Sequence, residues 1–414
     1  MLQISLLLCG RNFIHRNCHF LTLAGLLWSL LGVLVLTVGM LGASYFPLRL
    51  FGWLLLCESL VTLIASSGAD GARRGILIFT GGTTDVVALL ILSGLSGSNL
   101  LLAILLGFIC FLSGTFVTAS AWVVRYPHWR RAFTGGVGQI LFAAFLFQPY
   151  PTHHDGTVPQ FIGVIMLLSA ANCLLLSLRL RKLAPGVTIF DVQPAQASAA
   201  LIQINTPAAL PVQPALTGPP ELRVLIWTPE GSSGVISTGH AALEMQDINI
   251  SHYPAVDIDR SPAEFFRTLR ALQENDVPGK FQSNYASEAA AWCEADRRVC
   301  FHTFSVISLR AFSIHYRQRE VYNLTRRNCS SSVAYALDGV LYRNGGWGVF
   351  MRLFLQPELW IAAQLRRRAT TMAWTPGLVL DYSRALHGLV HPVRLRWFRK
   401  PNGTTSNEDG SGEG

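Results

Sequence analysis

The strongest constraint on this chain is a series of six long apolar stretches in its first 180 residues. Each is close to the ~20 residues that a helix needs to cross the hydrocarbon layer of a bilayer. Phe46-Pro47, Tyr126-Pro127 and Tyr150-Pro151 lie between stretches, where proline ends a helix and begins a turn. The sequence therefore predicts a six-helix transmembrane bundle over residues 1–182. The expected spans are roughly 20–42, 48–66, 75–95, 99–121, 132–150 and 159–178.

Composition and charge agree with a membrane protein. The chain is 50% apolar and 14% charged, with a mean hydropathy of +0.36, which is too apolar for a single soluble domain. Residues 1–182 hold eleven of the 33 Lys and Arg but only four of the 24 Asp and Glu. Because this excess of base lies beside apolar segments, it indicates orientation in a membrane. We therefore expect the lipid bilayer as a partner and no nucleic acid.

The basic residues between the stretches predict which way the bundle faces. Ten fall in loops that share one side, and the other side has only Arg49. By the positive-inside rule, both termini and everything after Lys182 are expected to be cytoplasmic. The apolar run at residues 2–10 lacks a basic leader and a cleavage site, so we expect it to remain in the mature chain. The ten are Arg11, Arg16, Arg73, Arg74, Arg125, Arg130, Arg131, Arg179, Arg181 and Lys182.

The bundle segment resembles the HdeD-like acid-resistance family of six-helix inner-membrane proteins. The matching features are the segments 25–32 and 138–142, each followed by an aromatic-proline turn. The resemblance implies a bacterial inner-membrane protein and a role in acid or stress tolerance. Two acids, Glu58 and Asp85, lie inside predicted spans, and intramembrane carboxylates are costly. We expect each to hydrogen-bond Ser or Thr on a neighbouring helix.

A linker and a tail flank the second half of the chain. Residues 183–220 contain seven Pro and eight Ala, with Asp191 as the only charge, which is typical of a tether without a core. Residues 401–414 are expected to be a disordered tail. The eight cysteines show no close Cys-x-x-Cys pair, which favours a reducing compartment. Cys293, Cys300 and His302 lack a fourth ligand at regular spacing, so neither a metal nor a cofactor is expected.

Residues 221–400 have an α+β pattern. Strands are predicted at 223–227, 239–245, 248–253, 300–309 and 320–324, with a helix at 311–318. Beginning at Cys329, an amphipathic helix carries Val333, Leu337 and Leu341 on its inner face. The positive end of that helix and the neighbouring Arg326 and Arg327 would favour the thiolate form of Cys329.

Thiolate chemistry also needs a proton acceptor. His240 follows Gly239 at the start of a predicted strand and is the candidate general base. His252, twelve residues later, is the candidate for orienting His240, and Asp257, Asp259 or a residue near Ser305 are alternatives.

The segments Gly239-His240-Ala-Ala-Leu-Glu, Ile250-Ser-His252-Tyr-Pro and Arg327-Asn328-Cys329-Ser-Ser resemble the permuted papain-like hydrolases of the NlpC and lecithin-retinol-acyltransferase types. The resemblance covers about residues 221–345. It implies Cys329 as nucleophile, His240 as base and His252 as the orienting group. The backbone amide of Cys329 would bind the oxyanion, and Asn328 could add a side-chain donor.

The leading hypothesis is a membrane-anchored cysteine hydrolase, a peptidase or amidase with an acyl-enzyme mechanism. The alternative is a non-enzymatic stress-resistance protein whose soluble domain only binds or senses. A cytoplasmic location disfavours peptidoglycan, which leaves protein, peptide or acyl-lipid substrates. The Arg366-Arg367-Arg368 run is expected to be a solvated helix end or a patch facing anionic headgroups.

Overall fold

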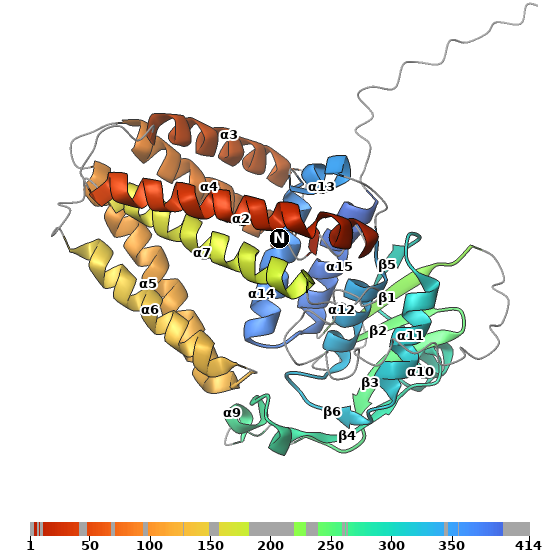
Figure 1. Cartoon of the computed structure of the whole chain (residues 1–414). Coiled ribbons are helices and arrows are strands. Elements are labelled where there is room, and N and C mark those ends of the chain that lie inside the picture. The colour runs from red at the N-terminus through yellow and green to blue at the C-terminus, as the bar shows by residue number, and fades with distance from the viewer. Residues whose placement is uncertain are drawn as a thin grey trace, which may run out of the picture.

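The computed structural model describes residues 4–5, 8, 11–40, 48–67, 71–93, 98–126, 128–148, 157–181, 219–228, 239–258, 261, 264–342, 347–354 and 356–391. Within these ranges the first half of the chain is helical and the second half combines helices with a sheet (Figure 1). The predicted linker, apart from residues 219 and 220, and the predicted tail lie outside the described residues.

Long helices cover the six predicted apolar stretches, which confirms these stretches as helical. They pack as antiparallel pairs of α2 with α7, α3 with α4, and α5 with α6. Small residues allow the close approach: a Cβ atom on Gly114 of α5 would lie 2.7 Å from the Gly136 carbonyl oxygen of α6. The helices are α2 (Arg11–Met40), α3 (Leu48–Ser67), α4 (Gly71–Ser93), α5 (Ser98–Val124), α6 (Trp129–Phe147) and α7 (Thr157–Arg181).

Within the described ranges, three helices are long and apolar enough to cross a membrane: His19–Thr37, Leu100–Val124 and Pro159–Leu178. They belong to α2, α5 and α7. Shorter apolar segments run over Gly52–Ile64 in α3 and Leu77–Ser93 in α4. These segments identify the chain as a membrane protein.

One of the two acids in the predicted spans, Asp85, has the expected partner. Ser59 Oγ on α3 donates to Asp85 Oδ1 on α4 over 2.9 Å, so the predicted hydrogen bond to a neighbouring helix is confirmed for Asp85. The side chain of Glu58 lies exposed on α3.

The second half contains a six-stranded antiparallel sheet with the order β5-β1-β2-β3-β4-β6. The first three predicted strands are confirmed to within one residue. The predicted strand over 300–309 is confirmed only at residues 300 and 301, because Ser305 caps a helix that begins at Val306 by accepting a hydrogen bond from Ser308 N. The strands are β1 (Leu222–Trp227), β2 (His240–Met245), β3 (Ile248–Pro254), β4 (Val277–Phe281), β5 (Arg297–Phe301) and β6 (Val321–Tyr322).

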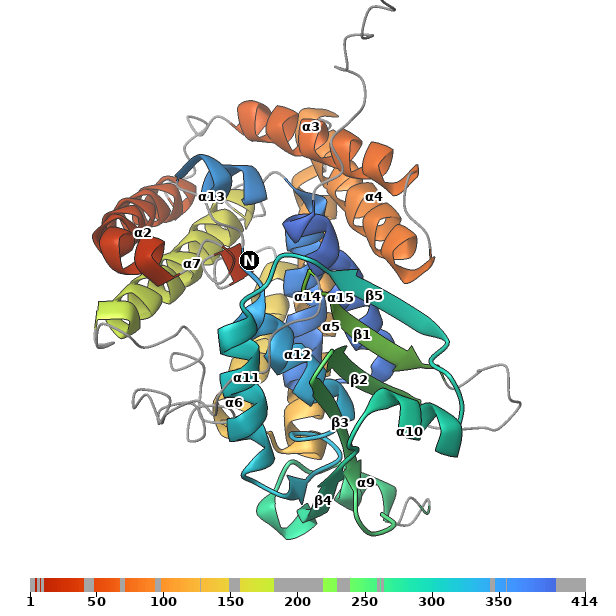
Figure 2. The same cartoon turned by 90° about the vertical axis from the view of Figure 1, so that its right-hand side faces the viewer.

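Helices cover both faces of the sheet (Figure 2). The main core lies between one face and α11, α12 and α15, whereas α10 packs on the other face through Tyr285 against Leu225 and Trp227. The elements are α9 (Phe265–Thr268), η3 (Gln273–Asn275), α10 (Tyr285–Ala291), α11 (Val306–Arg317), α12 (Cys329–Val340), α13 (Trp347–Phe354), α14 (Pro357–Thr371) and α15 (Pro376–Val390).

The expectation that the Arg366-Arg367-Arg368 run is a solvated patch is wrong for Arg366. Its side chain is buried, and Nη1 lies 2.7 Å from Oδ2 of the buried Asp338 on α12. Tyr382 OH donates to the other oxygen of Asp338 over 2.5 Å. The ion pair joins α12 to α14, and the Tyr382 hydrogen bond adds α15. Arg367 and Arg368 are exposed.

The sheet domain contacts the helical half near the C-terminal end of α5. Ser120 Oγ donates to the carbonyl oxygen of Thr371, at the end of α14. Ala271 N donates to the carbonyl oxygen of Val124 over 2.8 Å. Both contacts involve the last two turns of α5.

Candidate active site

Cys329 is the first residue of α12, as the sequence predicts. Asn328 caps the helix with an extended backbone (φ −110°), and its Oδ1 accepts from Ser331 N over 2.7 Å. Ser331 Oγ accepts in return from Asn328 N over 2.8 Å. This reciprocal capping box ends the preceding loop and starts the helix at the thiol-bearing residue.

The side chain of Asn328 has a structural role. Its Nδ2 donates to the carbonyl oxygens of Leu324, over 2.8 Å, and of Trp374, over 2.9 Å. Both amide hydrogens are therefore in use, and the oxygen caps α12. The expected donation from Asn328 to an oxyanion is not available in this arrangement.

The environment of Cys329 disfavours the thiolate form. The side chain is buried, and burial raises its pKa. The two arginines expected to favour thiolate bind elsewhere: Arg326 pairs with Asp276, and Arg327 donates to backbone carbonyls and lies 3.9 Å from the ring centroid of Tyr316. The expectation of a lowered thiol pKa is wrong, because desolvation by burial outweighs the hydrogen bonds to the sulfur that lower the pKa.

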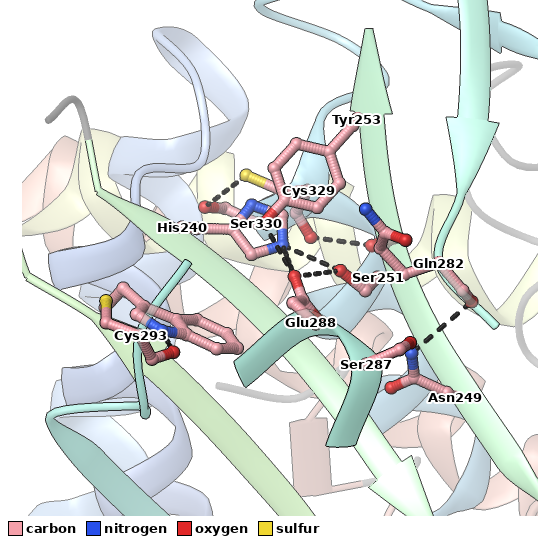
Figure 3. A network of polar contacts seen from close by, with 12 residues as sticks. His240, Asn249, Ser251, Tyr253, Gln282, Ser287, Glu288, Cys293, Cys329 and Ser330 are labelled. Atoms are coloured by element: carbon pink, nitrogen blue, oxygen red, sulfur yellow. Dashed lines mark hydrogen bonds and ion pairs between the residues drawn. The ribbon is translucent and has the colours of Figure 1, made fainter. Parts of the chain in front are cut away.

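His240 opens β2 and is buried on the face of the sheet that α10 covers. Its Nε2 lies 2.9 Å from Ser251 Oγ and 3.4 Å from Glu288 Oε1 (Figure 3). The ring stacks on Tyr253 with 4.0 Å between centroids. Burial, and secondarily His252, lower the pKa of His240 to about 3. The imidazole is therefore neutral near pH 7.

Glu288 is a site residue that the sequence reasoning missed. It lies on α10, and its Oε1 accepts from Ser251 Oγ over 2.7 Å and from Tyr253 OH over 2.6 Å. Burial raises the pKa of Glu288, and the two hydrogen bonds oppose that rise. The sequence signal for its helix is Asn284, whose side chain caps α10 at Ser287 N.

Contrary to the expectation, His252 does not contact His240. The pairing of Ala242 with Ser251 places Ser251 on the same face as His240, so the next residue, His252, points to the opposite face. There its ring stacks on Phe281 at 4.5 Å between centroids, and neither ring nitrogen has a hydrogen-bond partner among the described residues. The even spacing of His240 and His252 does not place them on one face of the sheet. The pairing of Met245 with Ile248 at the turn sets the register of the two strands, and this register decides the face on which each side chain lies.

The thiol and the imidazole approach β2 at neighbouring residues. The sulfur of Cys329 contacts the backbone of Ala241, directly after His240, and lies 3.7 Å from Ser330 Oγ. Among the described residues, the hydrogen bonds of the sulfur and of His240 Nε2 do not join the two side chains to each other. Figure 3 shows both side chains beside the start of β2.

Neither comparisons with known proteins nor a metal-binding arrangement identifies this site. The chain matches no protein-family model, no curated protein and no solved structure. Within the described ranges, no group of three or more His, Cys, Asp or Glu side chains is arranged to hold a metal ion. The chemistry must be argued from the thiol, the imidazole and the carboxylate.

Proposed function

We propose that the chain is a membrane-anchored cysteine hydrolase. The observation that carries this proposal is the position of Cys329 at the start of α12, against the strand residue next to His240. In the proposed arrangement, Nε2 of His240 is held by Ser251 and Glu288, and Nδ1 is assigned to the thiol. Cys329 is then the nucleophile, His240 the base and Glu288 the group that orients the base.

The proposed reaction begins with a neutral pair. Nδ1 of His240 takes the proton of the Cys329 thiol as the sulfur attacks the carbonyl carbon of an ester or amide. The positive end of α12 and the Cys329 amide stabilise the oxyanion. The imidazolium, stabilised by Glu288, then protonates the leaving group and a thioester forms. Water, deprotonated by His240, hydrolyses the thioester and restores the thiol.

This mechanism requires Nδ1 and the sulfur to come within hydrogen-bond reach when substrate binds, since such contacts are often long without substrate. Glu288 acts as a positioning residue, because it holds the imidazole and compensates its charge. Replacing Glu288 by Gln retains the hydrogen bonds but removes the charge. We expect Glu288→Gln to lower turnover and shift its pH profile, while the fold remains intact.

We further propose that six helices span the bilayer, with the sheet domain on the cytoplasmic side of a bacterial inner membrane. The domain contacts the C-terminal end of α5, and Arg125, Arg130 and Arg131 follow that end, as the positive-inside rule requires. On that side the substrates are a protein, a peptide or an acyl lipid.

The experiment is labelling of the full-length protein in membranes with a thiol-directed acyl probe. The wild type should be labelled, and Cys329→Ala should not. His240→Ala should be labelled more slowly, because it lacks the base. The matched control is Cys293→Ala, which removes a half-buried thiol on the α10 side of the sheet. Labelling that persists in Cys329→Ala would contradict the proposal.

A second function is favoured by the raised pKa of Cys329. A thiol that stays protonated and makes no described contact with His240 is also what an inactive domain would show. In that case the bundle is the working part, as in an acid- or stress-resistance protein, and the sheet domain binds or senses. Absence of acyl transfer from any probe, together with an intact fold, would support this function.

A further inference from the structure

Two short helices of the sheet domain carry large apolar side chains on their outer surface. Phe265 and Phe266 lie on α9, and Phe266 is 63% exposed. Trp347 and Met351 lie on α13, and Met351 is 59% exposed. Side chains of this size gathered on short surface helices are typical of a surface that meets another molecule or a membrane.

The segment after α9 is fixed to the end of a candidate membrane span. Ala271 N donates to the carbonyl oxygen of Val124 over 2.8 Å, and Val124 is the last residue of the apolar Leu100–Val124 window. The guanidinium of Arg125 lies 5.6 Å from the ring of Trp122 and 5.7 Å from that of Trp129. Tryptophan and arginine together mark the headgroup level of a bilayer, so α9 lies next to that level.

Helix α13 is fixed in the same way to the beginning of another candidate span. Trp347 Nε1 donates to Asn17 Oδ1 over 3.3 Å, and its ring lies 5.5 Å from that of Phe20 in an edge-to-face arrangement. Both partners are at the start of the His19–Thr37 window on α2. The opposite side of α13 is buried through Phe350 and Leu353, so the helix carries apolar side chains on its outer side as well as on its buried side.

The two anchors lie at the same end of the helical half, because α2 begins and α5 ends where the sheet domain packs (Figure 1). We propose that this face of the domain lies on the bilayer surface, with Phe265, Phe266, Trp347 and Met351 inserted among the lipid headgroups. Exposed arginines on the same helices, Arg267 and Arg352, match the charge of anionic phospholipids.

This inference goes beyond the proposed function, because it requires no activity at Cys329. The proposed partner of this face of the domain is the phospholipid that surrounds the spans. Each of the two contacts, at α9 and at α13, is made at the end of a candidate span. The bilayer surface is therefore the partner that lies next to both. A second copy of the chain or another protein is the competing occupant that the experiment must separate.

The test places p-benzoylphenylalanine in place of Phe266 or Met351 in the full-length protein, reconstituted in nanodiscs of zwitterionic and anionic phospholipid. After irradiation, mass spectrometry identifies what has been crosslinked. The matched controls carry the same residue in place of Ile307 (64% exposed) or Trp292 (39% exposed). These lie on α11 and after α10, on elements of the sheet domain away from the bundle (Figure 1).

We expect phospholipid adducts at 266 and 351 in several-fold higher yield than at either control position. Because the replaced side chains are exposed, the fold should tolerate all four changes, and thermal melting checks this. Lipid yields at 266 or 351 no higher than at the controls would overturn the proposal. Crosslinks from either position mainly to a second copy or to another protein would overturn it as well.

Discussion

The two halves of this molecule use polar side chains in opposite ways. The helical half turns large apolar residues such as Leu30, Phe79 and Leu112 outward, and isolated hydrogen bonds such as Ser59 to Asp85 join its helices. The sheet domain instead buries connected polar groups around His240 and Asp338. In lipid, the outer surface of a protein can be apolar. Buried polar networks are costly and are maintained where they specify a structure or a site.

The largest expected effect concerns the His240 network. If it serves catalysis, His240→Ala should lower hydrolysis by about 10²–10⁴-fold, the usual contribution of a general base. Cys329→Ala should cost at least as much. The double variant should lose no more than Cys329→Ala, because the two residues act as one unit. Turnover of an activated acyl ester by the full-length protein measures this.

The same measurements separate a catalytic role of the buried His240 network from a structural one. Additive losses would mean that His240 and Cys329 act independently, and equal turnover in all variants would mean that the network is structural only. Cys293→Ala should leave turnover unchanged and serves as the control.

The second effect concerns the Arg366–Asp338 ion pair. Arg366→Met removes one partner of a buried pair and leaves the Asp338 carboxylate uncompensated, so the free energy of unfolding of the sheet domain should fall by about 3–5 kcal/mol. The control is Arg367→Met, which changes an exposed neighbour and should have little effect. Thermal or denaturant unfolding of the full-length protein gives both values. A small loss in Arg366→Met would show that the domain tolerates the unpaired charge.

A third effect is acid lability of the sheet domain. The pKa values of His240 and His252 are lowered by burial from 6.5 to about 3. Between these values the unfolded chain binds protons that the folded chain does not, so stability falls as the pH falls from 6.5 towards 3. At pH 4 the loss is on the order of 3 kcal/mol for each histidine. The raised pKa of Glu288 opposes part of this loss.

His252→Phe tests the pH effect without touching the His240 network. The variant keeps an aromatic ring among Phe281, Tyr316 and Tyr322 but cannot bind a proton. Its stability should therefore fall less steeply between pH 6.5 and 4 than that of the wild type. Parallel curves for the two proteins would contradict the assignment. Hydrolysis should change little, because His252 is only the secondary cause of the lowered pKa of His240.

The features that sequence patterns predict here are local. Apolar length predicts the helices of the first half, and the Asn328-Cys329 cap predicts the start of α12. The features that were missed depend on contacts between distant segments. Glu288 meets His240 across 48 positions of sequence, and Arg366 is buried only because Asp338 on another helix compensates its charge.

The face of the sheet on which a side chain lies is another non-local property. The spacing of His240 and His252 is even, yet the turn between β2 and β3 places them on opposite faces. The raised pKa of Cys329 likewise follows from burial by distant segments, and Arg326 and Arg327 find their partners elsewhere. No pattern within the Arg-Arg-Asn-Cys segment shows those partners.

The smallest expected effect lies in the helical half. Ser59→Ala and Asp85→Ala each remove the hydrogen bond between α3 and α4, and their coupling energy in a double-mutant cycle should be about 0.6 kcal/mol, the average for such bonds in membranes. Unfolding of the full-length protein in detergent or bicelles measures it. Hydrolysis by the sheet domain should be unaffected. A coupling several times larger, or loss of proton-dependent stress protection in Asp85→Asn with the fold intact, would move the function into the bundle. The contrast between the halves would then be reversed, because an isolated carboxylate among apolar helices would be the group on which activity depends.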